Sequence, residues 1–556
     1  MPIPFRVFAR LASAPAAFLV MAAAAPVTFF IAPFSPELLA QAGPTAKAAR
    51  PASAAYTARG ADSVHALLQS FRAGRALLDA AVAAHGGLEA LRAARTMGAR
   101  LRGWDHWRNQ SRRPLAPFDS TPHEADVRID LPHERIRFSQ TFEYPGEIGR
   151  GFLLVTDGAR SFRADTRAHT YTRMQWPPAA QQTGNLFYLP QHILLAALDN
   201  PAVVRHVGRM RLSSGADVDV ITASVANGQL NLAFDRTSHR LRATVGVWSD
   251  ATAGDVVQET EYPDYRELNG VLVPTRRVSW VDGVRTRDLE YVEARGNATL
   301  ADADVAVPAG FSDITVPVPT PASTLASAST PAPWNEPVRT LADGVWLVQA
   351  NGPSVLAVAM RDYVLLVDAP PTLDSAVLAR ITTLAGKPVR YAAPTHHHDD
   401  HAGGVRRLAA AGVTIVTTPG NRDFMSRIAA SRPTFGPPWV LANGAPVQAT
   451  IETIAGGRRT ITDGRRTVEL LDIGRGPHAE EMLVAWLPVE GILFQGDLLD
   501  VNADGAITRA TNNATTMHFA RWLEGRGIRP RVFAGSHGTL RDAADFQRLI
   551  GMPIPK

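Results

Sequence analysis

The spacing of hydrophobic residues in the first half of the chain changes from a helical pattern to an alternating one. Residues 73–94 carry apolar positions at helical spacing, interrupted by Gly86-Gly87. Beyond them, apolar and polar residues alternate in short runs that end at turn pairs such as Asp157-Gly158, a pattern typical of strands. The runs cover residues 129–138, 152–155, 217–223 and, as strand, turn and strand, 262–274. This half is therefore predicted to be a β-rich α+β domain that opens with a helix.

The second half alternates apolar strands with helical segments. Strand-like runs at 345–348, 355–358 and 363–369 are followed by a helical pattern at 375–384 and by another strand before Thr395. Strands that alternate with helices predict an α/β fold in which helices cover the sheets.

Composition marks the boundaries between these parts. At 556 residues the chain is long enough for two folded units. A Pro/Ala/Ser/Thr-rich stretch at 313–337 is predicted to be a linker, and residues 43–62 a disordered lead-in. We therefore expect a β-rich accessory domain at 63–312 and a second domain at 338–552.

The first 42 residues have the features of a secretory signal peptide. Arg6 and Arg10 precede an uncharged stretch, 11–34, and Ala40-Gln41-Ala42 offers a cleavage site with small residues. Prolines interrupt the uncharged stretch, which favours a cleaved signal peptide at 1–42 over a retained membrane anchor. We expect export, to a bacterial periplasm, with no stable transmembrane span after cleavage.

Charge and cysteine content exclude several classes of function. The net charge is +5, but all except three of the 57 basic residues are arginines spread along the chain, so no nucleic-acid partner is expected, because such a partner needs basic residues clustered on one face. The chain has no cysteine, which excludes a thiolate nucleophile or a thiolate metal ligand.

The run from Thr395 to Gly404 carries the strongest chemical signal. It offers His396 and His398 to one metal ion, and Asp400 and His401 to a second. Imidazole nitrogens and carboxylate oxygens are ligands that zinc accepts in hydrolytic sites. The alternative, a solvated histidine-rich loop, does not account for this spacing or for the Gly403-Gly404 that follows. His397 and Asp399 lie between the candidate ligands and are expected to support them or to face solvent.

The same run resembles the T-H-x-H-x-D-H-x-G-G signature of metallo-β-lactamase-fold hydrolases. The resemblance implies three further ligands, which the sequence supplies in order as His478, Asp497 and His537. It also implies a C-terminal αββα sandwich, in which two sheets lie between helices. His518 follows Asp497 on a helical pattern and is expected to pack instead of binding metal.

In this resemblance, the ligands divide into two sets. His396, His398 and His478 hold one ion, Asp400, His401 and His537 hold the other, and Asp497 bridges both; Asp400 is also the candidate catalytic residue. The implied cofactors are two divalent metal ions, zinc foremost, with iron or manganese as alternatives. A hydroxide bridging them would attack the carbonyl of an ester, thioester, lactone or amide.

The substrate is less constrained than the chemistry. An acid at Asp497 favours the glyoxalase II-like and lactonase-like branches over the true β-lactamases, whereas Asp500 replaces the tyrosine typical of lactonases. A cationic centre favours an anionic small molecule. The alternatives that stay open are a β-lactamase-like amidase and an envelope carrier of lipids or other amphiphiles with an accessory hydrolase domain.

The carrier alternative depends on the N-terminal domain, which loosely resembles the half-barrels of periplasmic lipoprotein-carrier-like proteins. Its opening helix, its succession of strands and the Gly270–Pro274 segment carry this resemblance, which implies a curved antiparallel sheet. A scaffold that covers the active-site mouth is an equal alternative. Tyr188 and His192 are expected to be buried and not to form a lid.

Overall fold

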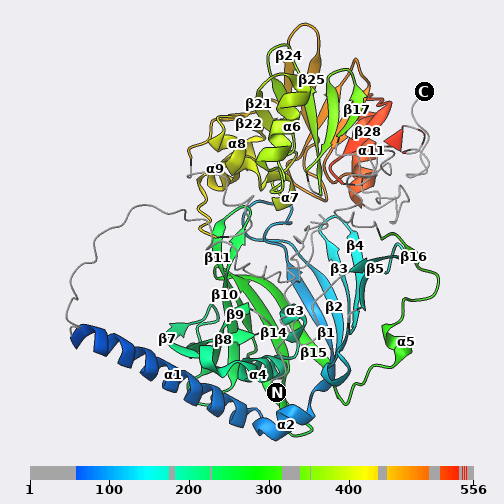
Figure 1. Cartoon of the computed structure of the whole chain (residues 1–556). Coiled ribbons are helices and arrows are strands. Elements are labelled where there is room, and N and C mark those ends of the chain that lie inside the picture. Colours follow the sequence, from blue (N-terminus) through cyan, green and yellow to red (C-terminus); the bar gives the residue numbers. More distant parts are fainter. Residues whose placement is uncertain are drawn as a thin grey trace, which may run out of the picture.

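The computed structural model describes residues 58–158, 160–174, 182–225, 228–315, 338–350, 352–435, 447–499 and 514–537, together with 541–542, 544 and 546. Figure 1 shows two β-rich parts, with the later part of the chain seated on one end of the earlier part. The predicted signal peptide, lead-in residues 43–57, linker residues 316–337 and Asp500 lie outside the described residues.

The N-terminal part opens with two helices separated by a glycine turn. Helix α1 (Ala58–Ala84) begins earlier than predicted, within the expected lead-in, and α2 (Gly87–Ala93) follows it. Gly86 between them has φ +105°, and a Cβ there would lie 2.0 Å from the carbonyl oxygen of Gly270. Only glycine combines this backbone conformation with so close an approach.

A single 14-stranded sheet makes up most of this part. All its neighbouring strands pair antiparallel except β16 and β6, and their order is β16-β6-β5-β4-β3-β2-β1-β15-β14-β11-β10-β9-β8-β7. The strands are β1 (Thr96–His106), β2 (Ser120–Asp130), β3 (Arg135–Tyr144), β4 (Ile148–Asp157), β5 (Arg160–Asp165), β6 (Thr170–Met174), β7 (Arg205–Arg211), β8 (Asp217–Val225), β9 (Gly228–Asp235), β10 (Leu241–Asp250), β11 (Gly254–Glu261), β14 (Arg276–Val281), β15 (Val284–Gly296) and β16 (Ser312–Asp313). The predicted strand–turn–strand segment forms the separate hairpin of β12 (Tyr265–Leu268) and β13 (Val271–Pro274).

One sequence-based expectation in this sheet is wrong. Residues 129–138 form the end of β2, a turn and the start of β3 instead of one strand. Pro132 lies in a short 3-10 turn at Leu131–His133, and Glu134 takes φ 53°. Proline cannot donate a ladder hydrogen bond, so the strand ends before it. The alternation of apolar and polar residues nevertheless continues into β3, on the far side of the turn.

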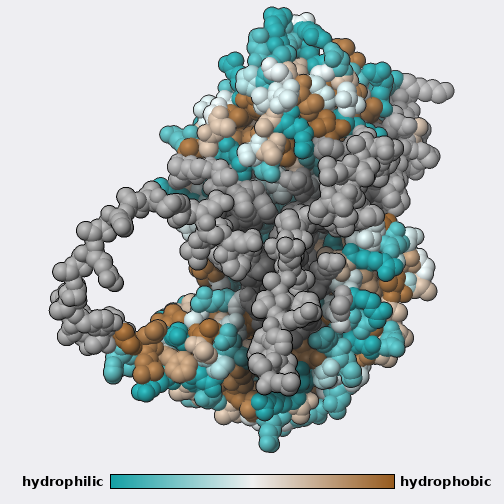
Figure 2. Space-filling model, viewed as in Figure 1, coloured by the Kyte–Doolittle hydropathy of each residue, from teal (hydrophilic) through white to brown (hydrophobic). Residues whose placement is uncertain are grey.

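The core of this part lies between the sheet and helix α4 (Pro190–Asp199). Tyr188 and His192 are buried there, at 6% and 1% exposure, as the sequence predicts. The hydroxyl groups of Tyr262 and Tyr291 donate to the carbonyl oxygens of Phe187 and Tyr188, which ties the segment before α4 to the sheet. Figure 2 shows apolar residues at the surface near the start of α1, where Val64, Leu67 and Leu68 are exposed.

The C-terminal part contains two sheets. The seven-stranded sheet runs β17-β18-β19-β20-β21-β22-β23, and the six-stranded sheet runs β24-β25-β26-β27-β28-β29. The strands are β17 (Val338–Ala342), β18 (Val345–Gln349), β19 (Ser354–Ala359), β20 (Val364–Val367), β21 (Val389–Ala393), β22 (Thr414–Thr417), β23 (Ile451–Thr453), β24 (Arg458–Thr462), β25 (Thr467–Asp472), β26 (Leu483–Leu487), β27 (Ile492–Gln495), β28 (Val532–Gly535) and β29 (Arg541–Asp542).

Successive side chains of these strands enter different layers of the core, as strand geometry requires. Leu365 and Val367 of β20 pack between the sheets, whereas Val364 and Leu366 pack on the outer face. The outer face meets helices α6 (Ser375–Ala385), α8 (Val405–Ala410) and α9 (Arg422–Ala430). Helix α11 (Ala514–Arg526) covers the other sheet through Phe519 and Leu523. The result is the predicted αββα sandwich.

Candidate metal centre

The predicted ligands lie at strand ends along one edge of the sandwich. His396 and His398 follow β21, and Asp400 and His401 lie in the short helix α7 (Asp399–Ala402). The chain can turn sharply from α7 into α8 because Gly404 has no side chain: a Cβ there would lie 2.5 Å from the carbonyl oxygen of Pro370.

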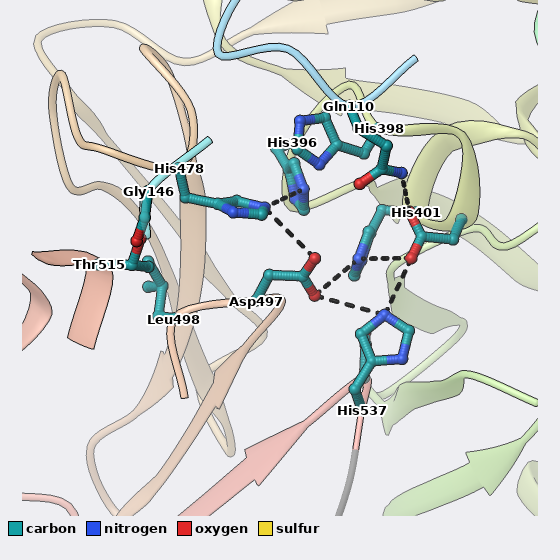
Figure 3. A network of polar contacts seen from close by, with 12 residues as sticks. Gln110, Gly146, His396, His398, His401, His478, Asp497, Leu498, Thr515 and His537 are labelled. Carbon is teal, nitrogen blue, oxygen red and sulfur yellow. Dashed lines mark hydrogen bonds and ion pairs between the residues drawn. The ribbon is translucent and has the colours of Figure 1, made fainter. Parts of the chain in front are cut away.

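The three downstream candidate ligands come from the second sheet. His478 lies between β25 and β26, Asp497 follows β27, and His537 follows β28. Strands β27 and β28 are parallel neighbours, so their carboxyl ends bring Asp497 and His537 to the same edge. The structure thus brings all seven sequence-predicted residues together (Figure 3).

A first group of ligand atoms comes from His396, His398, His478 and Asp497. These atoms all lie within 4.8 Å of one another. The Nε2 atoms of His396 and His478 are 3.1 Å apart, and His478 Nε2 is 3.3 Å from Asp497 Oδ2.

A second group comes from Asp400, His401, Asp497 and His537, under the same 4.8 Å limit. Asp497 Oδ1 lies 2.9 Å from His401 Nε2 and 3.4 Å from His537 Nε2. His537 Nε2 lies 3.0 Å from Asp400 Oδ2. Because Asp497 presents one oxygen to each group, it is placed as a bridge between them.

These separations fit divalent metal ions. Around a tetrahedral zinc ion with bonds of about 2.0–2.2 Å, ligand atoms lie roughly 3.3 Å apart. His401 Nε2 and Asp497 Oδ1 face each other without the alignment of a hydrogen bond, and the buried Nδ1 of His398 has no hydrogen-bond partner in the described part of the chain. Buried polar atoms without partners are costly, and a bound cation would satisfy all three.

The protonation of His396, His398 and Asp400 suits metal binding, whereas a metal ion would have to displace protons from His401 and His537. Burial opposes protonation of these two rings, but the charges of Asp497 and Asp400 outweigh it and raise their pKa. Burial, followed by the neighbouring histidines, holds the pKa of His396 and of His398 well below the ordinary value. Burial opposes ionisation of Asp400, but the charges of His401 and His537 outweigh it and lower the pKa of this carboxyl. Neutral imidazoles and ionised carboxylates are the ligand forms that metals require.

Asp368 is a site residue that the sequence analysis missed. It directly follows β20 with φ 72°, and its Oδ2 lies 2.8 Å from His401 Nδ1. Its Oδ1 accepts a 2.7 Å hydrogen bond from the backbone N–H of Thr395, and the Ser536 hydroxyl also donates to its carboxylate. A carboxylate behind a histidine ligand fixes the tautomer and the orientation of the ring. The available signal was an aspartate at the end of a wholly buried strand.

The residues between the ligands have defined partners. His397 is buried, and its Nε2 lies 2.9 Å from the carbonyl oxygen of Ser111. Burial, together with the charge of Asp400, raises the pKa of Asp399 to about 7, and its Oδ1 accepts a hydrogen bond from Gln110. His518 lies on α11 and belongs to neither ligand group.

The part of the chain that holds this cluster matches a known protein family. Residues 350–537 match the model of the metallo-beta-lactamase superfamily. They are a metallo-beta-lactamase superfamily domain. This domain includes all seven candidate ligands and every strand of the two sheets except β17, β18 and β29. It therefore indicates a metal-dependent hydrolase that acts on a small molecule.

Solved structures similar to the chain include metallo-beta-lactamases. One, from Pontibacter korlensis, has 22% sequence identity and a TM-score of 0.29, and the match covers 38% of this chain and 96% of that chain. The DIM-1 metallo-beta-lactamase exposed to ceftazidime has 20% sequence identity and a TM-score of 0.30. The match covers 38% of this chain and 94% of that chain.

The metallo-beta-lactamase superfamily match does not reach the N-terminal part, so the resemblance of that part to lipoprotein-carrier half-barrels stays a prediction. Among the described residues, no helix is both long enough and apolar enough to span a bilayer.

Proposed function

We propose that the chain is an exported hydrolase with two divalent metal ions, zinc foremost, that cleaves an ester, thioester, lactone or amide. The observation that carries this proposal is the convergence of seven histidine and aspartate side chains into two groups that share Asp497. Bound metal ions would supply the nucleophile by lowering the pKa of water from 15.7 to about 7.

The chain's own residues would divide the remaining work. His396, His398 and His478 would hold one ion through nitrogen atoms, and Asp400, His401 and His537 the other, with Asp497 between them. Asp400 Oδ1 accepts a hydrogen bond from Gln110 and Oδ2 faces His537, so the carboxylate has a fixed orientation. An ionised, oriented carboxylate can hold the attacking water by accepting its hydrogen, which supports Asp400 as the catalytic residue.

The exposure of the cluster supports attack from one side. The side chains of Asp400 and His537 are each 18% exposed and that of Asp497 is 14% exposed, whereas His396 and His398 are fully buried. A substrate carbonyl would therefore approach along the edge formed by Asp400, Asp497 and His537. Uncompensated positive charge of two ions at this edge would favour an anionic substrate or intermediate.

Metal analysis and mutagenesis of the full chain test the proposal. The purified protein should contain close to two divalent ions per chain, with zinc, iron and manganese measured separately. His396→Ala and Asp497→Ala should abolish turnover, whereas His133→Ala, which removes a surface histidine with 60% exposure, should leave it unchanged. Full activity in both site variants would contradict the proposal.

A substrate panel would then fix the reaction. Thioesters, lactones, esters and β-lactams should be compared at equal concentration with the zinc-loaded protein. Preferential β-lactam cleavage would select the amidase alternative. Export is tested separately, by locating the protein in cell fractions and by sequencing its mature N-terminus, which should begin near Gly43.

A further inference from the structure

One segment of the N-terminal part reaches the metal centre. The chain from Trp107 to Asp119 connects β1 to β2 and extends towards helix α7 (Figure 1). We call it the bridging segment. Its two ends are held together, because the backbone N–H of Trp107 donates to the carbonyl oxygen of Asp119 over 3.0 Å.

The bridging segment is anchored at two further points. Arg108 and Asn109 both donate to Oδ2 of Asp250, at 3.0 and 2.9 Å. Asp250 ends β10, in the other half of the sheet. Near the segment's far end, Oδ2 of Asp119 accepts hydrogen bonds from the Ser111 hydroxyl and the backbone N–H of Arg112, each 2.8 Å long. These anchors fix the backbone between residues 108 and 112.

The carbonyl group of Ser111 points at two neighbouring histidines. Its oxygen lies 2.9 Å from Nε2 of His397 and 2.9 Å from Nε2 of His398. A carbonyl oxygen can only accept, so both rings must carry their proton on Nε2. The lone pair of His398 is then on Nδ1, the buried atom without a hydrogen-bond partner among the described residues. Ser111 thus selects the tautomer that could bind a metal ion.

The side chain of Gln110 acts on the neighbouring acids. Its Nε2 donates to Oδ1 of Asp399 over 2.7 Å and to Oδ1 of Asp400 over 2.9 Å. Gln110 is only 7% exposed, so water does not readily replace it. With Oδ1 of Asp400 held by the amide, Oδ2 is turned towards His537, 3.0 Å away.

Other contacts hold the N-terminal and C-terminal parts of the chain in the same relative position. The backbone N–H of Glu480, two residues after the ligand His478, donates to the carbonyl oxygen of Arg112 over 2.8 Å. Thr515 at the start of α11 donates to the carbonyl oxygen of Gly146 (Figure 3), and the backbone N–H of Thr434 donates to Asp255. The contacts come from the bridging segment, from the turn between β3 and β4 and from the start of β11. The bridging segment is therefore not a loosely placed loop.

We propose that the bridging segment is a positioning part of the metal centre, in which the Ser111 carbonyl group orients His398 and the Gln110 amide group orients Asp400. This inference rests on the proposed metal-dependent function. It assigns the N-terminal domain a role in metal binding that a separate carrier domain would not have.

Gln110→Met tests the proposal, because methionine keeps the length of the side chain and removes both hydrogen bonds. The affinity for Zn²⁺ should be measured by competition with a chromophoric chelator on the full chain. Loss of an outer partner of a metal ligand typically weakens binding by about 10- to 100-fold, and we expect a loss in this range. The absorption spectrum of the Co²⁺-loaded variant should also change, which a general loss of stability would not cause.

Two further variants complete the design. Gln229→Met is the matched control, because Gln229 is exposed on β9 and its side chain donates a hydrogen bond to Thr222, far from the metal centre in the sequence. Its Zn²⁺ affinity should equal that of the wild type. Ser111→Ala removes the anchor to Asp119 without altering any ligand, so it should weaken Zn²⁺ binding even if Gln110→Met fails to fold.

The outcomes separate the two proposals. A wild-type chain that binds no divalent ion would overturn both the proposed function and this inference. Wild-type Zn²⁺ affinity and an unchanged Co²⁺ spectrum in Gln110→Met and Ser111→Ala would overturn the inference alone, because a metal-loaded hydrolase would remain.

Discussion

The carboxylate of Asp368 lies 2.8 Å from Nδ1 of His401, on the side of the ring opposite to Asp497. Because this carboxylate accepts the Nδ1 proton, the ring is oriented with Nε2 towards Asp400 and Asp497. Asp368 is itself fully buried and held by the backbone of Thr395. The orientation of His401 therefore depends on a residue that would not touch a metal ion.

Replacing Asp368 with alanine should weaken the second metal group. We expect an affinity for Zn²⁺ that is about 10- to 100-fold lower, since outer-shell partners of ligating histidines typically contribute that much. Chelator competition measures the effect. Asp343→Ala, which removes an aspartate side chain with 88% exposure from the same domain, should bind Zn²⁺ normally; equal affinities in the two variants would refute the assigned role.

The adjacent residues His397 and His398 should behave differently when each is replaced by alanine. His398→Ala should lower the metal content by about one ion per chain, because His398 belongs to the first ligand group. His397→Ala should retain both ions and lose stability, by about 1–3 kcal/mol, because it leaves a buried carbonyl with one hydrogen bond fewer. Elemental analysis and chemical unfolding distinguish these results, and loss of one ion in His397→Ala would contradict the ligand assignment.

A glycine at the boundary between the two parts provides a steric test. A Cβ on Gly146 would lie 2.3 Å from Thr515 Oγ1 and 3.3 Å from the backbone nitrogen of His478. Gly146→Ala should therefore lower the free energy of unfolding by about 1–3 kcal/mol through overpacking. The free energy of unfolding should fall by about a further 1–2 kcal/mol, because alanine is strained in the left-handed backbone conformation of Gly146.

Gly283 offers the matched control for that variant. It has φ +75°, close to the +93° of Gly146, but no atom lies within 4 Å of its Cβ position. Gly283→Ala should show only the backbone cost, as measured by denaturant unfolding. If the two variants lose the same stability, the close approach of Gly146 to α11 is not sterically tight.

The buried His192 should make the stability of the protein sensitive to acid. Burial lowers its pKa from 6.5 to about 4, so the ring is neutral in both states above pH 6.5. As the pH falls below 6.5, the unfolded chain takes up the proton first, and the free energy of unfolding falls until about pH 4. The difference of roughly 2.5 units corresponds to about 3 kcal/mol.

His192→Gln should remove this contribution. Denaturant unfolding between pH 6.5 and 4 should show a shallower decline for the variant than for the wild type. A parallel decline in wild type and His192→Gln would contradict the prediction.

The cluster of seven histidine and aspartate residues could be predicted because each member lies in a short motif at the end of an apolar strand. The run from His396 to His401 has its spacing set by local backbone geometry, and β27 and β28 each end just before their ligand. The sandwich was predictable for a similar reason, since buried strands such as β20 are wholly apolar. In these segments, local sequence and tertiary structure favour the same conformation.

Residues that act from another part of the chain could not be predicted in this way. Gln110 lies 290 residues before Asp400, and nothing in the sequence near Gln110 indicates a partner so distant. Predicting the role of Asp368 would have required the knowledge that β20 and β21 are parallel neighbours. The turn at Pro132 was missed because apolar residues alternate equally on both sides of it, so periodicity alone cannot distinguish one long strand from two paired ones.

The contact between Ser111 and His397 joins residues 286 positions apart, and this separation has a consequence for the order of folding. The strands of the N-terminal sheet all precede the candidate ligands along the chain. Contacts between such distant residues form late, because closing a long loop has an entropic cost. The sheet can therefore serve as an internal template on which the metal domain completes its folding, and the capture of metal ions should be among the last events of maturation.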